Sequence, residues 1–327
     1  MQATLRLTIM QYGTAGWSFE SLDPQRGGLT IMKRREWLKM VPAVVGSSFV
    51  STAAGAAPKS AGGPARIKSA ICAYSYRKQI ESGQMSYEDL VDVAVEHDID
   101  GLDLTVYWLP KTGLDEFLLS LRRKAYLSAV EIPAIAIRSD LCKGDERQQQ
   151  VEVAWLSYWV DVANKLGASH IRVFGGTVPK GATEEQAADW VVEILKRASE
   201  YAAKKGVILG LENHGGITLR AERVVAMVKA VDNPWVGINL DTGNFSRDPY
   251  SEIEMCVPYA VNSQFKTSVH YDDGRNEPSD WERVMKMFAA SGYKGYVSLE
   301  YEASEPVETA MPKYLGRLRE LSRKYSA

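Results

Sequence analysis

Short apolar runs alternate with amphipathic stretches of helical period from Ile67 to the C-terminus. Eight of the runs are typical of strands: residues 69–76, 101–108, 132–138, 170–176, 207–216, 236–244, 267–273 and 296–303. Between them, apolar residues recur every three or four positions, as in 87–98, 184–206 and 280–293. No low-complexity linker interrupts residues 67–327, and no Gly-rich phosphate loop follows the first run. The pattern predicts one α/β domain, a (β/α)8 TIM barrel.

Helix boundaries carry their own signals. Capping pairs stand at the start of three stretches, and glycines suited to a left-handed C-cap stand at the end of others. The pairs are Ser86 with Asp89, Thr183 with Gln186 and Ser279 with Glu282, and the glycines are Gly167, Gly206 and Gly292.

The N-terminal part of the chain is predicted to lie outside the barrel. Residues 32–66 begin MKRREWLKM, continue through a short apolar stretch to small residues, and resemble a bacterial twin-arginine signal peptide with a linker. This predicts export to the periplasm, and the apolar stretch is too short and rich in Gly, Ser and Ala for a stable membrane anchor. Residues 1–31 fit an upstream extension, with Met32 as the start of translation.

The composition is that of an ordinary globular protein, with 45% hydrophobic residues, 24% charged residues and a formal net charge of −2. A chain without basic excess is not expected to bind nucleic acid or an anionic membrane. The three cysteines have no metal-site spacing and are expected to be buried or inert thiols.

Four residues stand at the ends of consecutive predicted strands. Glu212, Asp241, His270 and Glu300 are spaced 29, 29 and 30 residues apart. The carboxyl ends of barrel strands build the active site of this fold. Singly, each residue also fits a salt bridge, a helix cap or a core histidine, but their shared register favours a metal site. The oxygen-rich set suits Mn2+ or Mg2+, with Co2+ or Zn2+ as alternatives.

The strings LENHGG, LDTGN, VHYDD and GYVSLEYE around these residues resemble the sugar phosphate isomerase/epimerase family, the xylose isomerase-like barrels. The resemblance implies that Glu212, Asp241, His270 and Glu300 hold a divalent metal. It also implies that Glu212 and Glu300 transfer protons on opposite sides of a bound sugar. A cation that chelates a carbonyl and the adjacent hydroxyl would stabilise the enediolate formed when the α-proton leaves.

Four further residues are candidate substrate contacts. His214 lies two residues past Glu212, on the same face of an extended strand, although a loop-packing role fits it too. Arg172 lies in a run that resembles the family's RVFGG, and either contacts substrate oxygens or pairs with Glu212 or Asp103 inside the barrel. Trp108 belongs to a set of aromatic residues at strand ends that suit either a sugar ring or the core. Asn244 is the fourth candidate substrate contact.

Several positions depart from the ketohexose epimerases of this family. Asn244 stands where those enzymes have a His, Asn276 where they have an Arg, and Thr218 where they have a Glu. Many relatives show HxKD on the seventh strand, whereas residues 270–273 read HYDD. A free ketohexose is therefore disfavoured as substrate. A periplasmic location and the lack of a phosphate-binding loop disfavour a sugar phosphate.

The sequence therefore predicts a metal-dependent isomerase or epimerase of an unphosphorylated sugar or sugar derivative. Two alternatives stay open: a lyase that enolises a keto-glycoside and expels a β-substituent, and a non-catalytic sugar-binding barrel. Endonuclease IV-type nucleases share the barrel, and the resemblance implies for them a three-metal site rich in histidine. This chain has only four histidines, which disfavours a nuclease. The oligomeric state is left open.

Overall fold

The computed structural model describes residues 8–13, 16–21, 30–33 and 63–326. The chain divides into two compact units, residues 1–52 and 53–327. In the first unit, β1 (Thr8–Gly13), β2 (Gly16–Ser21) and β3 (Thr30–Lys33) form an antiparallel sheet in that order. Most of the predicted export signal, residues 34–62, lies outside the described residues, so the export route stays a prediction.

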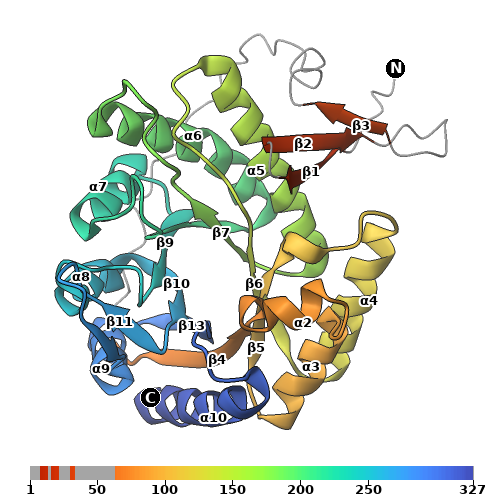
Figure 1. The fold of residues 1–327 in the computed structure, drawn as a ribbon, viewed down its shortest axis with the longest axis vertical. Helices are drawn as coiled ribbons and strands as arrows, with labels where there is room; N and C mark the ends of the chain where they lie inside the picture. The colour runs from red at the N-terminus through yellow and green to blue at the C-terminus, as the bar shows by residue number, and fades with distance from the viewer. Residues whose placement is uncertain (1–7, 14–15, 22–29, 34–62, 327) are drawn as a thin grey trace. The chain divides into compact units, whose positions relative to one another are not determined.

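Eight parallel strands of the second unit close into a barrel, in the order β10-β13-β4-β5-β6-β7-β8-β9 (Figure 1). This confirms the predicted (β/α)8 fold. The barrel strands are β4 (Arg66–Cys72), β5 (Gly101–Thr105), β6 (Glu131–Ala136), β7 (His170–Phe174), β8 (Ile208–Glu212), β9 (Val236–Asp241), β10 (Ala260–Phe265) and β13 (Lys294–Leu299).

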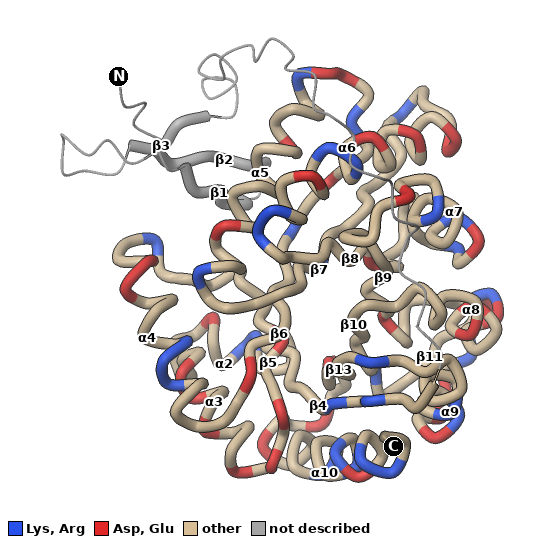
Figure 2. Tube along the Cα trace, turned by 180° about the vertical axis from the view of Figure 1, so that it is seen from behind, with Lys and Arg blue, Asp and Glu red and all other residues tan. Residues whose placement is uncertain are grey.

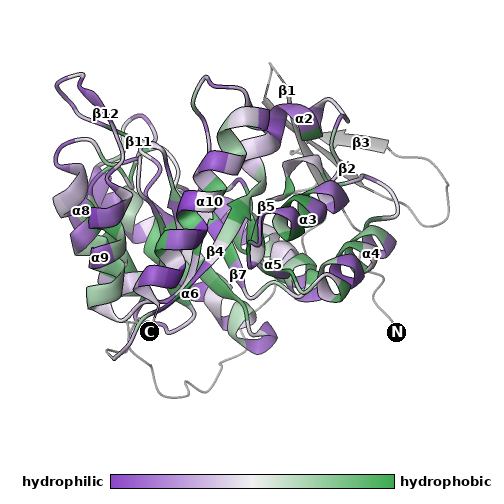
Figure 3. Cartoon of the chain, turned by 90° about the horizontal axis from the view of Figure 1, so that it is seen from below, coloured by the Kyte–Doolittle hydropathy of each residue, from purple (hydrophilic) through white to green (hydrophobic). Residues whose placement is uncertain are grey.

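The helices lie around the outside of this barrel, and each barrel strand is followed by at least one of them (Figure 1). Their outer faces are hydrophilic and their inner faces hydrophobic, as Figure 3 shows for α3, α4 and α10. The helices are α2 (Arg77–Glu81), α3 (Tyr87–Glu96), α4 (Leu114–Leu127), α5 (Glu146–Leu166), α6 (Glu184–Lys205), α7 (Ala221–Val231), α8 (Pro249–Cys256), α9 (Trp281–Ser291) and α10 (Val307–Tyr325).

Most of the predicted helix boundaries are confirmed. Capping boxes at Ser86 and Thr183 open α3 and α6, because each side chain accepts a backbone N–H that the first turn leaves unpaired. The three predicted glycines end α5, α6 and α9 in the left-handed conformation. The prediction for α9 was wrong at its start: Asp280, not Ser279, is the N-cap and accepts from the Arg283 N–H.

The seventh barrel strand is not the one that the sequence predicted. It is β10, whereas the predicted run 267–273 forms β11 (Ser268–His270) and the turn after it. β11 pairs antiparallel with β12 (Asn276–Pro278) in a separate two-stranded sheet. The true strand was overlooked because its inward-facing side chains, Asn262 and Gln264, are polar and break the apolar run.

These polar side chains belong to a buried hydrogen-bonded chain across the barrel. Asn262 Nδ2 donates to Asp103 Oδ2 at 3.1 Å and to Asn239 Oδ1 at 2.9 Å. Asn239 Nδ2 in turn donates to Gln264 Oε1 at 2.9 Å. Because buried polar groups are costly unless they are paired, this chain constrains the strands that supply it.

The outer surface of the barrel carries both signs of charge. Figure 2 shows Lys and Arg interspersed with Asp and Glu along the outer helices. Within the described residues, no helix is both long enough and apolar enough to cross a membrane. The three cysteines are free and buried, as predicted.

Candidate active site

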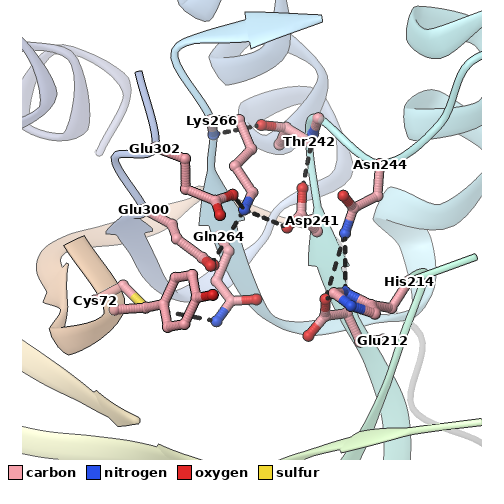
Figure 4. A network of polar contacts seen from close by, with 12 residues as sticks. Cys72, Glu212, His214, Asp241, Thr242, Asn244, Gln264, Lys266, Glu300 and Glu302 are labelled. Atoms are coloured by element: carbon pink, nitrogen blue, oxygen red, sulfur yellow. Dashed lines mark hydrogen bonds and ion pairs between the residues drawn. The ribbon is translucent and has the colours of Figure 1, made fainter. Parts of the chain in front are cut away.

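Glu212 ends β8 at the carboxyl end of the barrel and is only 2% exposed. Its Oε2 lies 3.0 Å from Arg172 Nε, and its Oε1 lies 2.7 Å from His214 Nδ1. Asn244 Nδ2 donates to the same Oε1 at 3.3 Å (Figure 4). Three of the four predicted substrate contacts therefore surround one carboxylate.

These neighbours decide the charge of Glu212. Burial by itself favours the neutral acid, but the Arg172 guanidinium and the His214 hydrogen bond together hold the pKa of Glu212 below its usual range. Burial lowers the pKa of His214, but the Glu212 carboxylate more than offsets this and leaves it raised. Glu212 is therefore ionised at neutral pH, so its carboxylate can accept a proton as a general base.

Arg172 is buried and contacts residues on β7 and just after β5. Its Nη2 donates to the Tyr107 hydroxyl at 3.0 Å, and its guanidinium lies 3.9 Å from the ring centroid of Phe174. The Phe174 ring contacts the His214 ring at 4.1 Å between centroids. Of the two interpretations of Arg172, the structure shows the interior ion pair with Glu212, and substrate contact stays a prediction.

Asp241 and Glu300 face an unexpected partner, Lys266. The Lys266 Nζ lies 3.1 Å from Glu300 Oε1 and 3.4 Å from Asp241 Oδ2, and it also contacts Glu302 (Figure 4). Burial raises the pKa of Asp241 to about 7, although Lys266 opposes the shift. Burial likewise raises the pKa of Glu300, and the ammonium offsets it only in part. Burial therefore raises the pKa of both carboxyl groups in this half of the site, in contrast to Glu212.

His270 does not stand at a barrel strand end. It lies on β11, it is exposed, and its Nε2 lies 3.4 Å from Ser268 Oγ. The register that suggested a metal ligand at this position was therefore wrong, because the run belongs to the two-stranded sheet outside the barrel.

The donor set does not fit the predicted divalent metal. Among the described residues, no three His, Cys, Asp or Glu side chains are grouped so that they could hold a metal ion. Asp241 Oδ1 accepts the Gly243 N–H at 2.8 Å, and its Oδ2 faces the Lys266 ammonium. Glu212 is likewise paired with a cation, Arg172. The carboxyl groups of Glu212 and Asp241 thus already have positive partners.

The corrected strand also changes the comparison with the HxKD pattern. The end of β10 and the residues after it read Gln264-Phe265-Lys266-Thr267, which retains the lysine and replaces the histidine with glutamine. Sequence reasoning missed Gln264, Lys266 and Glu302. The available signal was the alternation of Asn262, Gln264 and Lys266 with Val261, Ser263 and Phe265, which is the period of a strand.

Aromatic side chains stand at the ends of β4 and β5. Trp108 is half-buried and stacks on Tyr74, with the ring centroids 6.2 Å apart. It also contacts Tyr107 edge-on at 5.7 Å. Trp108 is therefore packed on one side, and its contact with a substrate stays a prediction.

Comparison with known proteins gives a family and a set of structural relatives. The family model described as xylose isomerase-like TIM barrel matches residues 91–321. No curated protein is significantly similar in sequence to the chain.

Three solved structures represent the structural similarity. D-psicose 3-epimerase from Clostridium cellulolyticum H10, solved with D-tagatose, is 20% identical, with a TM-score of 0.63 over 79% of this chain and 98% of its own. 3-Keto-D-glucoside 4-epimerase from E. coli is 12% identical, with a TM-score of 0.61 over 78% of this chain and 99% of its own. A xylose isomerase-like TIM barrel protein from Mycobacterium smegmatis, in complex with magnesium, is 18% identical, with a TM-score of 0.60 over 74% and 89%. At these identities the likeness establishes the fold.

Proposed function

Because the chain belongs to the xylose isomerase-like TIM barrel family, we propose that it is an isomerase or epimerase of an unphosphorylated sugar or sugar derivative. The family is the one that the sequence motifs resembled. The structural relatives support the proposal, since two of them are sugar epimerases and one of those acts on a keto-glucoside.

The observation that carries the proposal is the contrast between Glu212 and Glu300. The two carboxyl groups stand at the ends of β8 and β13, which β9 and β10 separate in the barrel. The surroundings push the pKa of Glu212 down and the pKa of Glu300 up. Titratable groups whose environments separate their pKa values in this way are suited to act as base and acid.

The two groups then have distinct roles in the proposed reaction. The Glu212 carboxylate removes the proton from the carbon next to a carbonyl group, and the electron pair of the broken C–H bond forms an enediolate. Glu300, whose pKa is raised, delivers a proton from the other side. Delivery of this proton to the same carbon, on the opposite face, inverts that carbon. Delivery to the former carbonyl carbon moves the carbonyl group, and the neighbouring hydroxyl then passes its proton to the former carbonyl oxygen. Both outcomes conserve the mass of the sugar.

The remaining site residues would position this chemistry. His214 and Asn244 both contact Glu212 Oε1, so they orient the carboxylate and leave its charge available. Trp108, at the end of β5, offers an aromatic ring at the carboxyl end of the barrel, where a sugar ring could stack. Dependence on Mn2+ or Mg2+, which the sequence predicted, is not part of the proposal because the donor set does not fit such a metal.

Product analysis on a panel of unphosphorylated sugars and keto-glycosides in deuterated water tests the proposal. The expected result is a product of unchanged composition apart from deuterium at the carbon that exchanged its proton. A product split into two molecules would indicate the lyase. Absence of both turnover and isotope exchange across the panel would favour the non-catalytic barrel and overturn the proposal.

Glu300→Gln is the matched variant, because the amide has the shape of the neutral acid but cannot donate its proton. We expect turnover to fall by about 10²–10⁴-fold while sugar affinity persists. Glu254→Gln, at an exposed position of α8, is the control and should leave turnover unchanged.

A further inference from the structure

Both backbone groups of Lys266 are hydrogen-bonded to side chains. Its N–H donates to Thr242 Oγ1 at 3.0 Å, and its carbonyl accepts from Trp281 Nε1 at 2.7 Å. Gly243 leaves room for the side chain, since a Cβ at that position would lie 2.5 Å from Lys266 Cγ and 2.7 Å from Lys266 Cβ. The start of this side chain is therefore fixed by three residues of two other segments.

The far end of the side chain is fixed as well. Only 12% of the Lys266 side chain is exposed, and its ammonium contacts the carboxylates of Asp241, Glu300 and Glu302. A divalent ion held by Asp241 and Glu300 would lie within a few ångströms of this ammonium. The repulsion at that distance amounts to several kcal/mol even at an effective dielectric constant of about 20. Lys266 and a metal ion therefore exclude each other at this position.

Gln264, which stands where the HxKD pattern has histidine, has its amide oxygen already engaged by another side chain. The ionised Asp103 carboxylate can only accept, so Asn262 must direct its Nδ2 towards it. Asn262 Nδ2 also donates to Asn239 Oδ1, which leaves Asn239 Nδ2 to donate to Gln264 Oε1. The Gln264 Oε1 is thereby engaged inside the barrel, and its Nε2 points towards Cys72 Sγ at 3.7 Å. An amide coordinates a metal through its oxygen, and the Gln264 oxygen is occupied by this hydrogen bond.

We propose that Lys266 is the resident cation of this site in place of a divalent metal, and that its ammonium and Gln264 Nε2 donate hydrogen bonds to the substrate oxygen on which negative charge develops. The catalytic half of this inference rests on the proposed function, whereas the exclusion of metal by Lys266 does not. An ammonium is a compact, strongly hydrated point charge on a flexible stem, and N–H donors fixed at a developing oxyanion are a general means of stabilising it.

The step is balanced without a further reactant. The C–H bond next to the carbonyl breaks, its proton goes to the Glu212 carboxylate, and its electron pair becomes the C=C bond of the enediolate. The carbonyl oxygen then carries the negative charge, and Lys266 and Gln264 donate to it without transferring their protons. When Glu300 protonates carbon, the negative charge on the oxygen returns to the carbonyl group. Glu212 is then protonated and Glu300 ionised, and proton exchange with water restores both.

Metal titration of the full chain tests the exclusion directly. Protein treated with a chelator is titrated with Mn2+, and free Mn2+ is followed by electron paramagnetic resonance with calorimetry alongside. We expect no stoichiometric Mn2+ binding to the unmodified protein. The double variant Gln264→His/Lys266→Met supplies an imidazole and removes the ammonium, and it should bind one Mn2+ at least about 100-fold more tightly.

Two further variants test whether the result comes from misfolding or from the loss of any lysine. Lys266→Gln removes the charge but keeps a polar side chain, so it serves if the double variant loses its far-UV circular dichroism. Lys68→Met is the control, because Lys68 is an exposed lysine paired with Glu131 on β6. It should leave Mn2+ binding unchanged.

Tight binding of one Mn2+ by the unmodified protein would overturn the proposal. So would the failure of every Lys266 variant to bind Mn2+, since the carboxylates would then not surround an ion position. If the sugar panel gives no turnover but the variants gain Mn2+ binding, the proposed function fails and the exclusion of metal by Lys266 stands.

Discussion

Arg172 and Glu212 form an ion pair of 3.0 Å between Nε and Oε2, and only 6% and 3% of the two side chains are exposed. Burial alone would neutralise the carboxyl group, so its charge depends on the guanidinium beside it. Buried pairs add little to stability over well-packed apolar residues, but the loss of one partner is costly because a charge is left buried alone. The pair therefore links the folding of the barrel to the charge of the proposed base.

Arg172→Met should destabilise the protein by about 3–5 kcal/mol, because Glu212 loses its cationic partner. Since Arg172 lowers the pKa of Glu212, its removal should also raise that pKa and move the acid limb of the pH–rate profile to higher pH. Urea unfolding and a pH series of turnover measure the two effects. Arg172→Lys, which keeps the charge, is the control, and an acid limb that stays in place in Arg172→Met would contradict the prediction.

His214→Gln should change the pKa of Glu212 with little change in the stability of the fold. The His214 side chain is 52% exposed, so its replacement should change the free energy of unfolding by no more than about 0.5 kcal/mol. The hydrogen bond to Glu212 Oε1 lowers the pKa of that carboxyl group, so the acid limb should again move upward, by less than in Arg172→Met. Unchanged turnover at every pH would show that His214 does not act on the base.

His170 should make the protein sensitive to acid. Both of its ring nitrogens are buried without a hydrogen-bond partner among the described residues, and burial lowers its pKa to about 3. The unfolded chain takes up this proton near pH 6.5, so the contribution of His170 to stability falls as the pH drops from about 6.5 to 3, by up to about 1.4 kcal/mol per pH unit.

Two buried carboxyl groups act in the opposite direction. Burial raises the pKa of Asp103 to about 6 and that of Asp241 to about 7, so each stabilises the folded state below pH 4, and this contribution is lost as the pH rises to those values. The effect of His170 is therefore measured as the difference in the free energy of unfolding between the unmodified protein and a His170 variant at each pH. The cost of His170→Asn should be about 2–3 kcal/mol smaller at pH 4.5 than at pH 7. Parallel stability–pH curves for variant and unmodified protein would contradict the assignment.

Gly210→Ala should destabilise the barrel by about 1–3 kcal/mol through overpacking. A Cβ on Gly210 would lie 2.2 Å from His170 Nε2, and both residues are enclosed by the strands. In a His170→Ala background the same substitution should cost much less, since the space is then free. A double-mutant cycle by urea unfolding gives the coupling, and additive costs would rule out a direct clash.

The overall fold could be predicted because each of its signals is local. Strand runs, capping pairs such as Ser86 with Asp89, and the C-terminal glycines all act within a few residues of the chain. Seven of the eight barrel strands have apolar cores that a sequence reveals. β10 does not, because its inward face forms the hydrogen-bonded chain instead of an apolar core.

The site could be predicted only in part, because some of its residues lie on or next to the polar strand β10 and give no local signal. Glu212, Asp241 and Glu300 end apolar strands or directly follow them, and the structure places all three at the carboxyl end of the barrel. His270 was chosen because its spacing matched the other three and because histidine is a common metal ligand, and Lys266 was not considered. A lysine in a polar segment gives no such signal, and its importance comes from contacts with residues far away in the sequence.

The chain from Asp103 through Asn262 and Asn239 to Gln264 also bears on how the barrel folds. A shift of β10 by one residue would turn Val261, Ser263 and Phe265 inward and remove both amide groups from the interior. Asp103 would then remain buried without Asn262, at the cost of an unpaired polar group. An apolar interior would tolerate such a slip more readily. The amides that orient Gln264 thus also favour the strand alignment seen in the closed barrel.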